Sequence, residues 1–182
     1  RDRSPSRGLG DVYKRQTESK VIEFGLGVFL DVCVKFLILF MISVLIGKEV
    51  EFALCLLSFC GLRCWAGGVH CPTRGTCLLA MIALCFISLV AGSLLENWGI
   101  GVFVVLWGLC ILILWLRAPG RTKTASLLEA EENLRKKVYS ILFCGGLILL
   151  SLLLTKSNWR GIIVISALLE SLSILPCKRN KI

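Results

Sequence analysis

Two neighbouring uncharged stretches decide the fold of this chain: GTCLLAMIALCFISLVAGSLL at residues 75–95 and NWGIGVFVVLWGLCILILWL at residues 97–116. They are 21 and 20 residues long, and only Glu96 separates them. A helix needs about 20 predominantly apolar residues to cross the hydrocarbon core of a bilayer. The sequence therefore predicts two membrane-spanning helices that form a tight helical hairpin.

The composition of the whole chain agrees with this prediction. Its 182 residues are 56% hydrophobic and 18% charged, and the mean hydropathy is +0.81. These values are typical of integral membrane proteins, and the length leaves no room for a separate water-soluble catalytic domain. We therefore expect an all-α, polytopic membrane protein with about six transmembrane segments, or with four spans plus two re-entrant helices.

Four further apolar runs complete this topology. Residues 138–155 form an uncharged run of 18, and residues 161–177 form a predicted span interrupted by Glu170. Residues 36–47 and 52–62 are uncharged runs of only 12 and 11, lengths that fit re-entrant or tilted elements as well as full crossings. Glu170 is the only carboxylate well inside a strong apolar run, and we interpret it as a helix-packing or boundary residue rather than a proton relay.

The basic residues predict the orientation of the chain in the membrane. Lysine and arginine are enriched in cytoplasmic loops of membrane proteins. In this sequence the basic clusters fall on one side of the strong spans: Arg63 and Arg74; Arg117, Arg121, Lys123, Arg135, Lys136 and Lys137; Lys178, Arg179 and Lys181. We expect this side to be cytoplasmic, in a bacterial cell membrane.

The first 16 residues are expected to be non-native. The stretch SRGLGDVYKRQ at residues 6–16 matches one reading frame of a transposase-based sequencing adapter. We therefore expect residues 17–182 to form a single membrane-embedded domain. Part of the formal net charge of +9 lies in the first 16 residues and the remainder lies in loops, so we expect no nucleic-acid partner.

An amphipathic segment follows the predicted hairpin. In residues 122–137, leucines recur at near-helical spacing among charged residues, and Glu131 can pair with Arg135 one turn later. The pattern predicts a helix on the membrane surface. It is either a solvated loop helix or a docking strip for an amphipathic peptide.

The polar stretch RCWAGGVHCPTRGTC, residues 63–77, contains the only histidine, His70. Cys77 follows seven residues later, and in a continuous helix this spacing would separate the two side chains by about 10.5 Å along the axis. A proton could not pass directly over that distance, so the helix must be broken between them. Pro72 and Gly75 are the expected breaks, and the Gly67-Gly68 pair allows positive φ or a close backbone approach just before the histidine.

Cys77 is then expected in the first turn of the next helix, with Thr73 or Thr76 as the N-cap. The helix dipole favours a thiolate at this position, and Arg74 adds a positive charge. A thiol paired with His70 is the arrangement used in nucleophilic catalysis, where the histidine acts first as base and then as acid.

Two other uses of these residues remain open. Cys71 is a competing nucleophile. A zinc site would take its ligands from Cys64, His70, Cys71 and Cys77, but these lack a CxxC pair, and adjacent His and Cys ligands fit a tetrahedral shell poorly. We therefore expect no metal and no other cofactor.

The sequence resembles the accessory gene regulator B family, whose signature is carried here by Arg63, Gly67, Gly68, His70 and Cys77. The resemblance covers nearly all of residues 17–182. It implies a membrane cysteine endopeptidase that cleaves the acidic C-terminal tail from a short amphipathic autoinducer propeptide and promotes its cyclisation to a thiolactone or lactone quorum-sensing peptide.

The resemblance also assigns roles to single residues. Cys77 is the implied nucleophile and His70 the general base, while Arg63, Gly67 and Gly68 support their geometry. Arg121 and Lys123 fall where the family's basic loop lies and are implied to bind the acidic tail. The implied partners are the propeptide and membrane lipid, and a homodimer remains open.

Two functions of other classes remain as alternatives. A small polytopic transporter or exporter would carry the peptide without cleaving it, and residues 63–77 would then form a gating or binding loop. A cysteine-rich metal-handling membrane protein would instead bind Zn²⁺ or Cu⁺ through His70.

Overall fold

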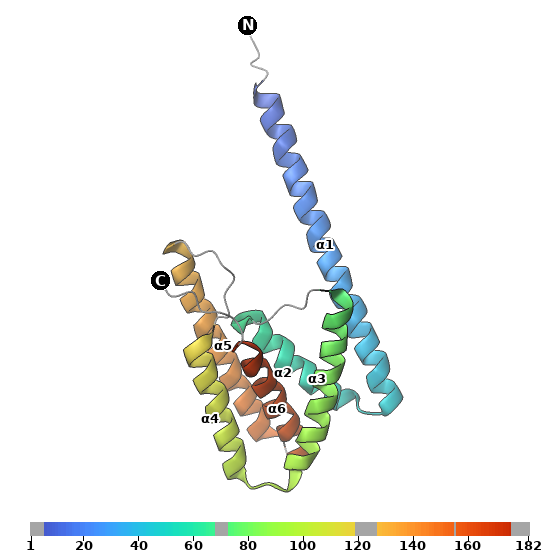
Figure 1. Ribbon diagram of the computed structural model, residues 1–182, viewed down its shortest axis with the longest axis vertical. Helices are drawn as coiled ribbons and strands as arrows, with labels where there is room; N and C mark the ends of the chain where they lie inside the picture. The colour runs from blue at the N-terminus through green and yellow to red at the C-terminus, as the bar shows by residue number, and fades with distance from the viewer. Residues whose placement is uncertain (1–5, 68–72, 119–126, 155, 176–182) are drawn as a thin grey trace. The chain divides into compact units, whose positions relative to one another are not determined.

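The computed structural model describes residues 6–67, 73–118, 127–154 and 156–175, with side chains from residue 22 in the first range and from residue 131 in the third. The described elements are all helices, which confirms the predicted all-α membrane fold (Figure 1). They are α1 (Ser6–Ile46), α2 (Glu49–Ala66), α3 (Arg74–Leu94), the short 3₁₀ helix η1 (Leu95–Asn97), α4 (Ile100–Arg117), α5 (Leu127–Leu153) and α6 (Ser157–Ser173).

The chain divides into two compact units, residues 1–42 and 43–182. Helix α1 continues through Asp31 and Lys35, the two charged residues that precede the uncharged run at 36–47. Asp31 and Lys35 lie one turn apart and form a salt bridge, so each charge is compensated within the helix. As a result the apolar segment is Ile22–Ile46, 25 residues that are long enough to span a membrane. Of the two alternatives left open for residues 36–47, this length fits a full crossing rather than a re-entrant element.

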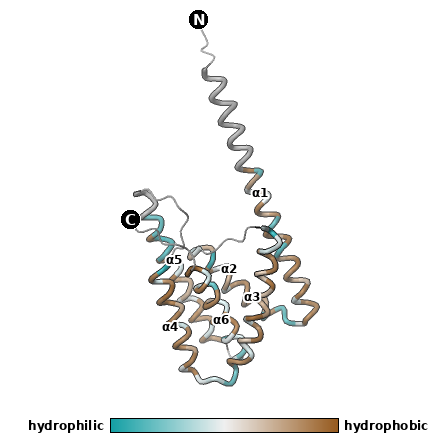
Figure 2. The backbone as a smooth tube through the Cα atoms, viewed as in Figure 1, coloured by the Kyte–Doolittle hydropathy of each residue, from teal (hydrophilic) through white to brown (hydrophobic). Residues whose placement is uncertain are grey.

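Three more helical segments are long and apolar enough to cross a membrane: Arg74–Asn97, Ile100–Arg117 and Glu131–Leu153. They confirm the predicted spans at 75–95, 97–116 and 138–155. Figure 2 shows hydrophobic residues along most of α3 and α4 and hydrophilic residues near the helix ends. Among the described residues α2 and α6 do not meet the same criterion: α6 has only 17 residues, and the 18 residues of α2 include three charged side chains.

Helix α6 is the centre of the second unit and packs against α2, α3, α4 and α5 (Figure 1). Eight of its 17 residues are buried. The closest approach is to α3: a Cβ atom on Gly161 would lie 2.6 Å from the carbonyl oxygen of Gly92. Both positions therefore need glycine, because any side chain would push the two backbones apart.

The predicted hairpin is only partly correct. A short turn joins α3 to α4, as expected, but the two helices have almost no contact with each other and each packs against α6 instead (Figure 1). The small residues of α6 allow its backbone to come close to both neighbours, so burial on α6 replaces direct packing between α3 and α4.

The amphipathic segment predicted at 122–137 is not a separate surface helix in its described part. From Leu127 onward it forms the first turns of α5, which continues into the membrane span. The expected bond between Arg135 Nη2 and Glu131 Oε1 is present at 2.7 Å, and Lys136 Nζ lies 2.7 Å from Glu132 Oε1.

Candidate active site

The candidate site lies at the end of the second unit where α2 finishes and α3 begins. The carboxyl end of α4, the amino end of α5 and the carboxyl end of α6 lie at this same end (Figure 1). Arg63, Arg74, Arg117 and Arg135 are therefore brought to one end of the bundle, as the alternating basic clusters predicted.

Gly67 forms the C-cap of α2 in a conformation that favours glycine. Its φ is 72° and its ψ is −163°, and its N–H donates to the Arg63 carbonyl oxygen at 3.1 Å. Residues with a Cβ atom rarely adopt positive φ. The expectation that this glycine supplies an unusual backbone conformation is confirmed, and it is at Gly67 that the helix ends.

A capping box starts α3. The Thr76 N–H donates to Thr73 Oγ1 at 3.2 Å, and the Thr73 N–H donates to Thr76 Oγ1 at 3.3 Å. Thr73 is therefore the N-cap, with an extended backbone, and two N–H groups that no helical carbonyl can reach are satisfied. Gly75 lies inside the first turn of α3, so the expectation that it breaks the helix was wrong.

Cys77 lies at the end of the first turn of α3, as predicted. Its N–H donates to the Thr73 carbonyl oxygen at 3.2 Å, and the residue is partly exposed. The capping box thus fixes the backbone that carries the thiol. A thiol at a helix amino end, where the dipole favours negative charge, is well placed to act as a nucleophile.

Several predicted site residues lie outside the described residues. They are Gly68, His70, Cys71, Arg121 and Lys123. The contact between the histidine and Cys77, the competing role of Cys71, the zinc alternative and the binding of an acidic tail therefore remain predictions.

The structure adds one contact that sequence reasoning missed. Arg63 Nη1 lies 3.5 Å from Glu170 Oε2, so the last turn of α2 is paired with the last turn of α6. The guanidinium also lies 5.6 Å from the centre of the Phe59 ring. The only available signal was that a carboxylate inside an apolar run requires a cationic partner. The partner could not be identified because it lies 107 residues away.

Glu170 is more than a packing residue in this arrangement. Its side chain is fully buried, whereas 27% of the Arg63 side chain is exposed. The second carboxylate oxygen, Oε1, has no hydrogen-bond partner within the described part of the chain. Arg63 is therefore the main compensation for a buried acidic group, and the pair joins the central helix to the candidate site.

A protein-family model matches the chain. Accessory gene regulator B matches residues 9–174, which is most of the chain. No curated protein and no solved structure matches. The chain therefore belongs to the accessory gene regulator B family and takes part in accessory-gene-regulator quorum sensing.

Proposed function

We propose that this protein is a membrane cysteine endopeptidase that removes the C-terminal tail of an autoinducer propeptide and promotes its cyclisation. The observation that carries the proposal is the position of Cys77, a partly exposed thiol in the capped first turn of α3. The two helices that flank the segment containing His70 end and begin at the same end of the bundle. Family membership supports the same assignment.

The chemistry requires two acyl transfers. His70 takes the proton of the Cys77 thiol, and the thiolate sulfur attacks the carbonyl carbon of the scissile peptide bond. The C–N bond breaks, the histidine gives its proton to the leaving amine, and an acyl-enzyme thioester remains. A Cys thiol or Ser hydroxyl within the propeptide then attacks that thioester, its proton returns to Cys77 through the histidine, and a thiolactone or lactone ring is released.

The proposed substrate suits the charge at this end of the bundle. An amphipathic propeptide would lie on the membrane surface, with its acidic tail close to the basic residues. Arg121 and Lys123 are the proposed tail contacts. By the positive-inside rule this end faces the cytoplasm of a bacterial cell, which is where a newly made propeptide is available.

The test is co-expression of the chain with a short peptide that has an amphipathic N-terminus, a central Cys or Ser and an acidic tail, followed by mass spectrometry of that peptide. We expect cleavage by the parent chain and none with Cys77→Ala or His70→Ala. Cys71→Ala and Cys64→Ala are matched controls that should still process the peptide. A cyclic product is distinguished from the linear acid because it lacks the mass of one water.

Other outcomes assign a different function. If Cys71→Ala abolishes cleavage and Cys77→Ala does not, the nucleophile is Cys71. If all variants process the peptide equally, or if the inserted parent chain leaves it intact, the peptidase proposal fails. Peptide transport would then be measured directly in vesicles that contain the chain.

A further inference from the structure

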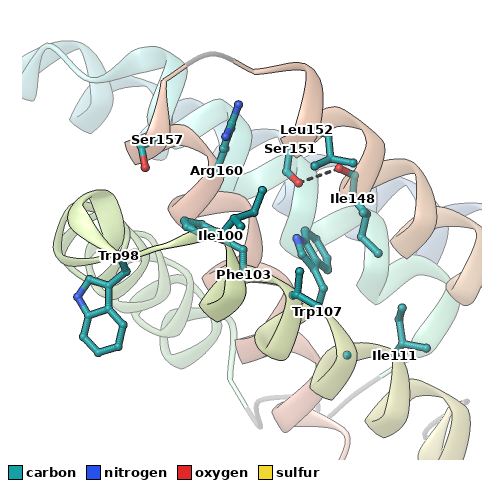
Figure 3. Close-up of a pocket in the computed structure, with 12 residues that line it drawn as sticks. Trp98, Ile100, Phe103, Trp107, Ile111, Ile148, Ser151, Leu152, Ser157 and Arg160 are labelled. Carbon is teal, nitrogen blue, oxygen red and sulfur yellow. Dashed lines mark hydrogen bonds between the residues drawn. The ribbon is translucent and has the colours of Figure 1, made fainter.

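A cavity lies at the opposite end of the second unit from Cys77. Its volume is about 440 Å³, within the range of about 300–1,000 Å³ that is usual for small-ligand pockets. It lies between α4 and α5, beside the start of α6 (Figure 3). It belongs neither to the candidate active site nor to the residues that the family signature singles out.

The wall contributed by α4 is one continuous helix face. Its lining residues recur at spacings of three and four along the helix: Ile100, Phe103, Val104, Trp107, Gly108 and Ile111. From the first to the last of these the helix rises about 16 Å, close to the roughly 15 Å depth of one leaflet's hydrocarbon region. The cavity therefore has the length and polarity of a lipid acyl chain.

The polar end of the cavity carries a positive charge. Arg160, in the first turn of α6, donates from Nε to the Leu154 carbonyl oxygen at 2.7 Å. Within the described residues this bond leaves the two terminal guanidinium nitrogens available to a ligand. Lys156 lies one turn earlier, with Nζ 4.5 Å from the centre of the Trp159 ring. Two short segments border this end of the cavity, residues 95–99 and residues 154–160. In their sequences these two cations outnumber the single acidic residue, Glu96.

The depth of this charge matches that of a lipid headgroup. Arg160 lies at the start of α6, and Trp98 lies just before α4, so both are at the end of the helices. Tryptophan and arginine side chains are typical of the membrane–water interface. Figure 3 shows Trp107 of α4 and Ile148 and Ser151 of α5 around the apolar part of the cavity, and Arg160 of α6 near the turn that follows α5.

We propose that this cavity binds one anionic phospholipid, with an acyl chain along α4 and the phosphate on Arg160. An arginine guanidinium suits a phosphate because its planar N–H groups can donate two parallel hydrogen bonds. A zwitterionic lipid can place the same chain in the cavity, but its cationic headgroup is repelled by the two basic side chains. The site therefore selects the lipid by headgroup charge.

The test reconstitutes the full chain in phosphatidylcholine nanodiscs and measures quenching of its tryptophan fluorescence by lipids with brominated acyl chains. Trp107 and Trp98 border the cavity, so a brominated chain bound there quenches them. We expect brominated phosphatidylglycerol to bind with about fivefold higher affinity than brominated phosphatidylcholine. This comparison needs no variant and does not depend on peptidase activity.

Two matched pairs of variants locate the effect. A side chain at Gly108 would point into open space on the cavity wall, so Gly108→Phe should fill the cavity and remove the preference. Gly101→Phe, on the same helix and also in open space but outside the cavity, should retain it. Arg160→Gln should reduce phosphatidylglycerol binding to the phosphatidylcholine level, whereas Lys156→Gln should reduce it less.

Four results would overturn the proposal. One is equal quenching of the parent chain by the two lipids. Another is equal loss of the preference in the two glycine variants. Competition by inorganic phosphate in the buffer would identify a soluble anion as the ligand. Dissociation of a dimer by Gly108→Phe would show that a second copy of the chain occupies the cavity.

Discussion

Helices α4 and α6 are almost equal in length, with 18 and 17 residues, yet they occupy different surroundings. Four residues of α4 are buried, compared with eight of α6. The more apolar helix is the more exposed one, because lipid tails solvate leucine and isoleucine as well as a protein interior does. The comparison teaches that high hydropathy identifies the helices at the lipid boundary, whereas small and polar residues identify the helix at the centre.

Gly161→Leu tests the packing of α6 most severely. The new side chain would overlap the backbone of Gly92, so we expect the free energy of unfolding to fall by about 3 kcal/mol or more. Gly101→Leu on α4 meets open space and should change stability by less than about 0.5 kcal/mol. Thermal unfolding in detergent compares the two. Equal losses would show that α4 is packed as tightly as α6.

Arg63→Leu tests the buried charge of α6. The change leaves the Glu170 carboxyl group without its cation inside the bundle, so we expect a loss of about 2 kcal/mol. The double variant Arg63→Leu/Glu170→Leu removes both charges and should recover part of that loss.

The same double-variant cycle has an outcome that contradicts the assignment. If the two single changes lower the unfolding midpoint additively, the two residues do not interact. Glu170 would then be compensated by groups other than Arg63.

Thr73→Ala removes the N-cap of α3, one of the lipid-facing helices. The Thr76 N–H loses its acceptor, the Thr73 hydroxyl oxygen, and we expect a loss of about 1 kcal/mol. The Cys77 N–H donates to the backbone carbonyl oxygen of Thr73, so loss of the cap loosens the turn that carries the thiol, and peptide processing should slow as well. Ser93→Ala, which removes a hydroxyl bond to Val90 near the other end of the same helix, is the control. If Thr73→Ala and Ser93→Ala change processing equally, the N-cap of α3 does not influence the candidate site.

Lys137→Gln examines the outer surface between α4 and α5. Lys137 Nζ lies 4.7 Å from the centre of the Trp115 ring, and a cation–π contact at an exposed site contributes about 0.5–1 kcal/mol. We therefore expect a small fall in the unfolding midpoint. Lys136→Gln, which removes only a surface pair with Glu132, should have a smaller effect. A larger effect of Lys136→Gln would show that the ring contact is not the stronger of the two.

The long uncharged runs were sufficient to predict α3, α4 and the membrane part of α5, because span length is a local property. The start of the apolar part of α1 was missed because Asp31 and Lys35 were counted as two charges, although an i,i+4 pair compensates itself. The central position of α6 was not predictable from periodicity. It depends on the close approach of Gly161 to Gly92, residues that lie far apart in the sequence.

In the candidate site, too, the features that could be predicted are those that the local sequence determines. Local signals placed Cys77 in a first helical turn, proposed Thr73 as one of two caps and assigned special backbone freedom to Gly67, and the structure confirms all three. The role of Glu170 was beyond reach, because its contact with Arg63 depends on how α2 and α6 pack. Sequence patterns therefore described the parts of the site that one helix end determines and missed the part that two distant helices determine.

The central position of α6 also determines the order in which the bundle can be assembled. Helices α2 to α5 all precede α6 in the chain, and a growing polypeptide leaves the ribosome from its amino end. These four helices therefore enter the membrane before the helix that touches them all has been synthesised. The contacts of Gly92 with Gly161 and of Arg63 with Glu170 can form only after α6 has been synthesised. The capped start of α3 can therefore form before the packing of α6 around it is complete.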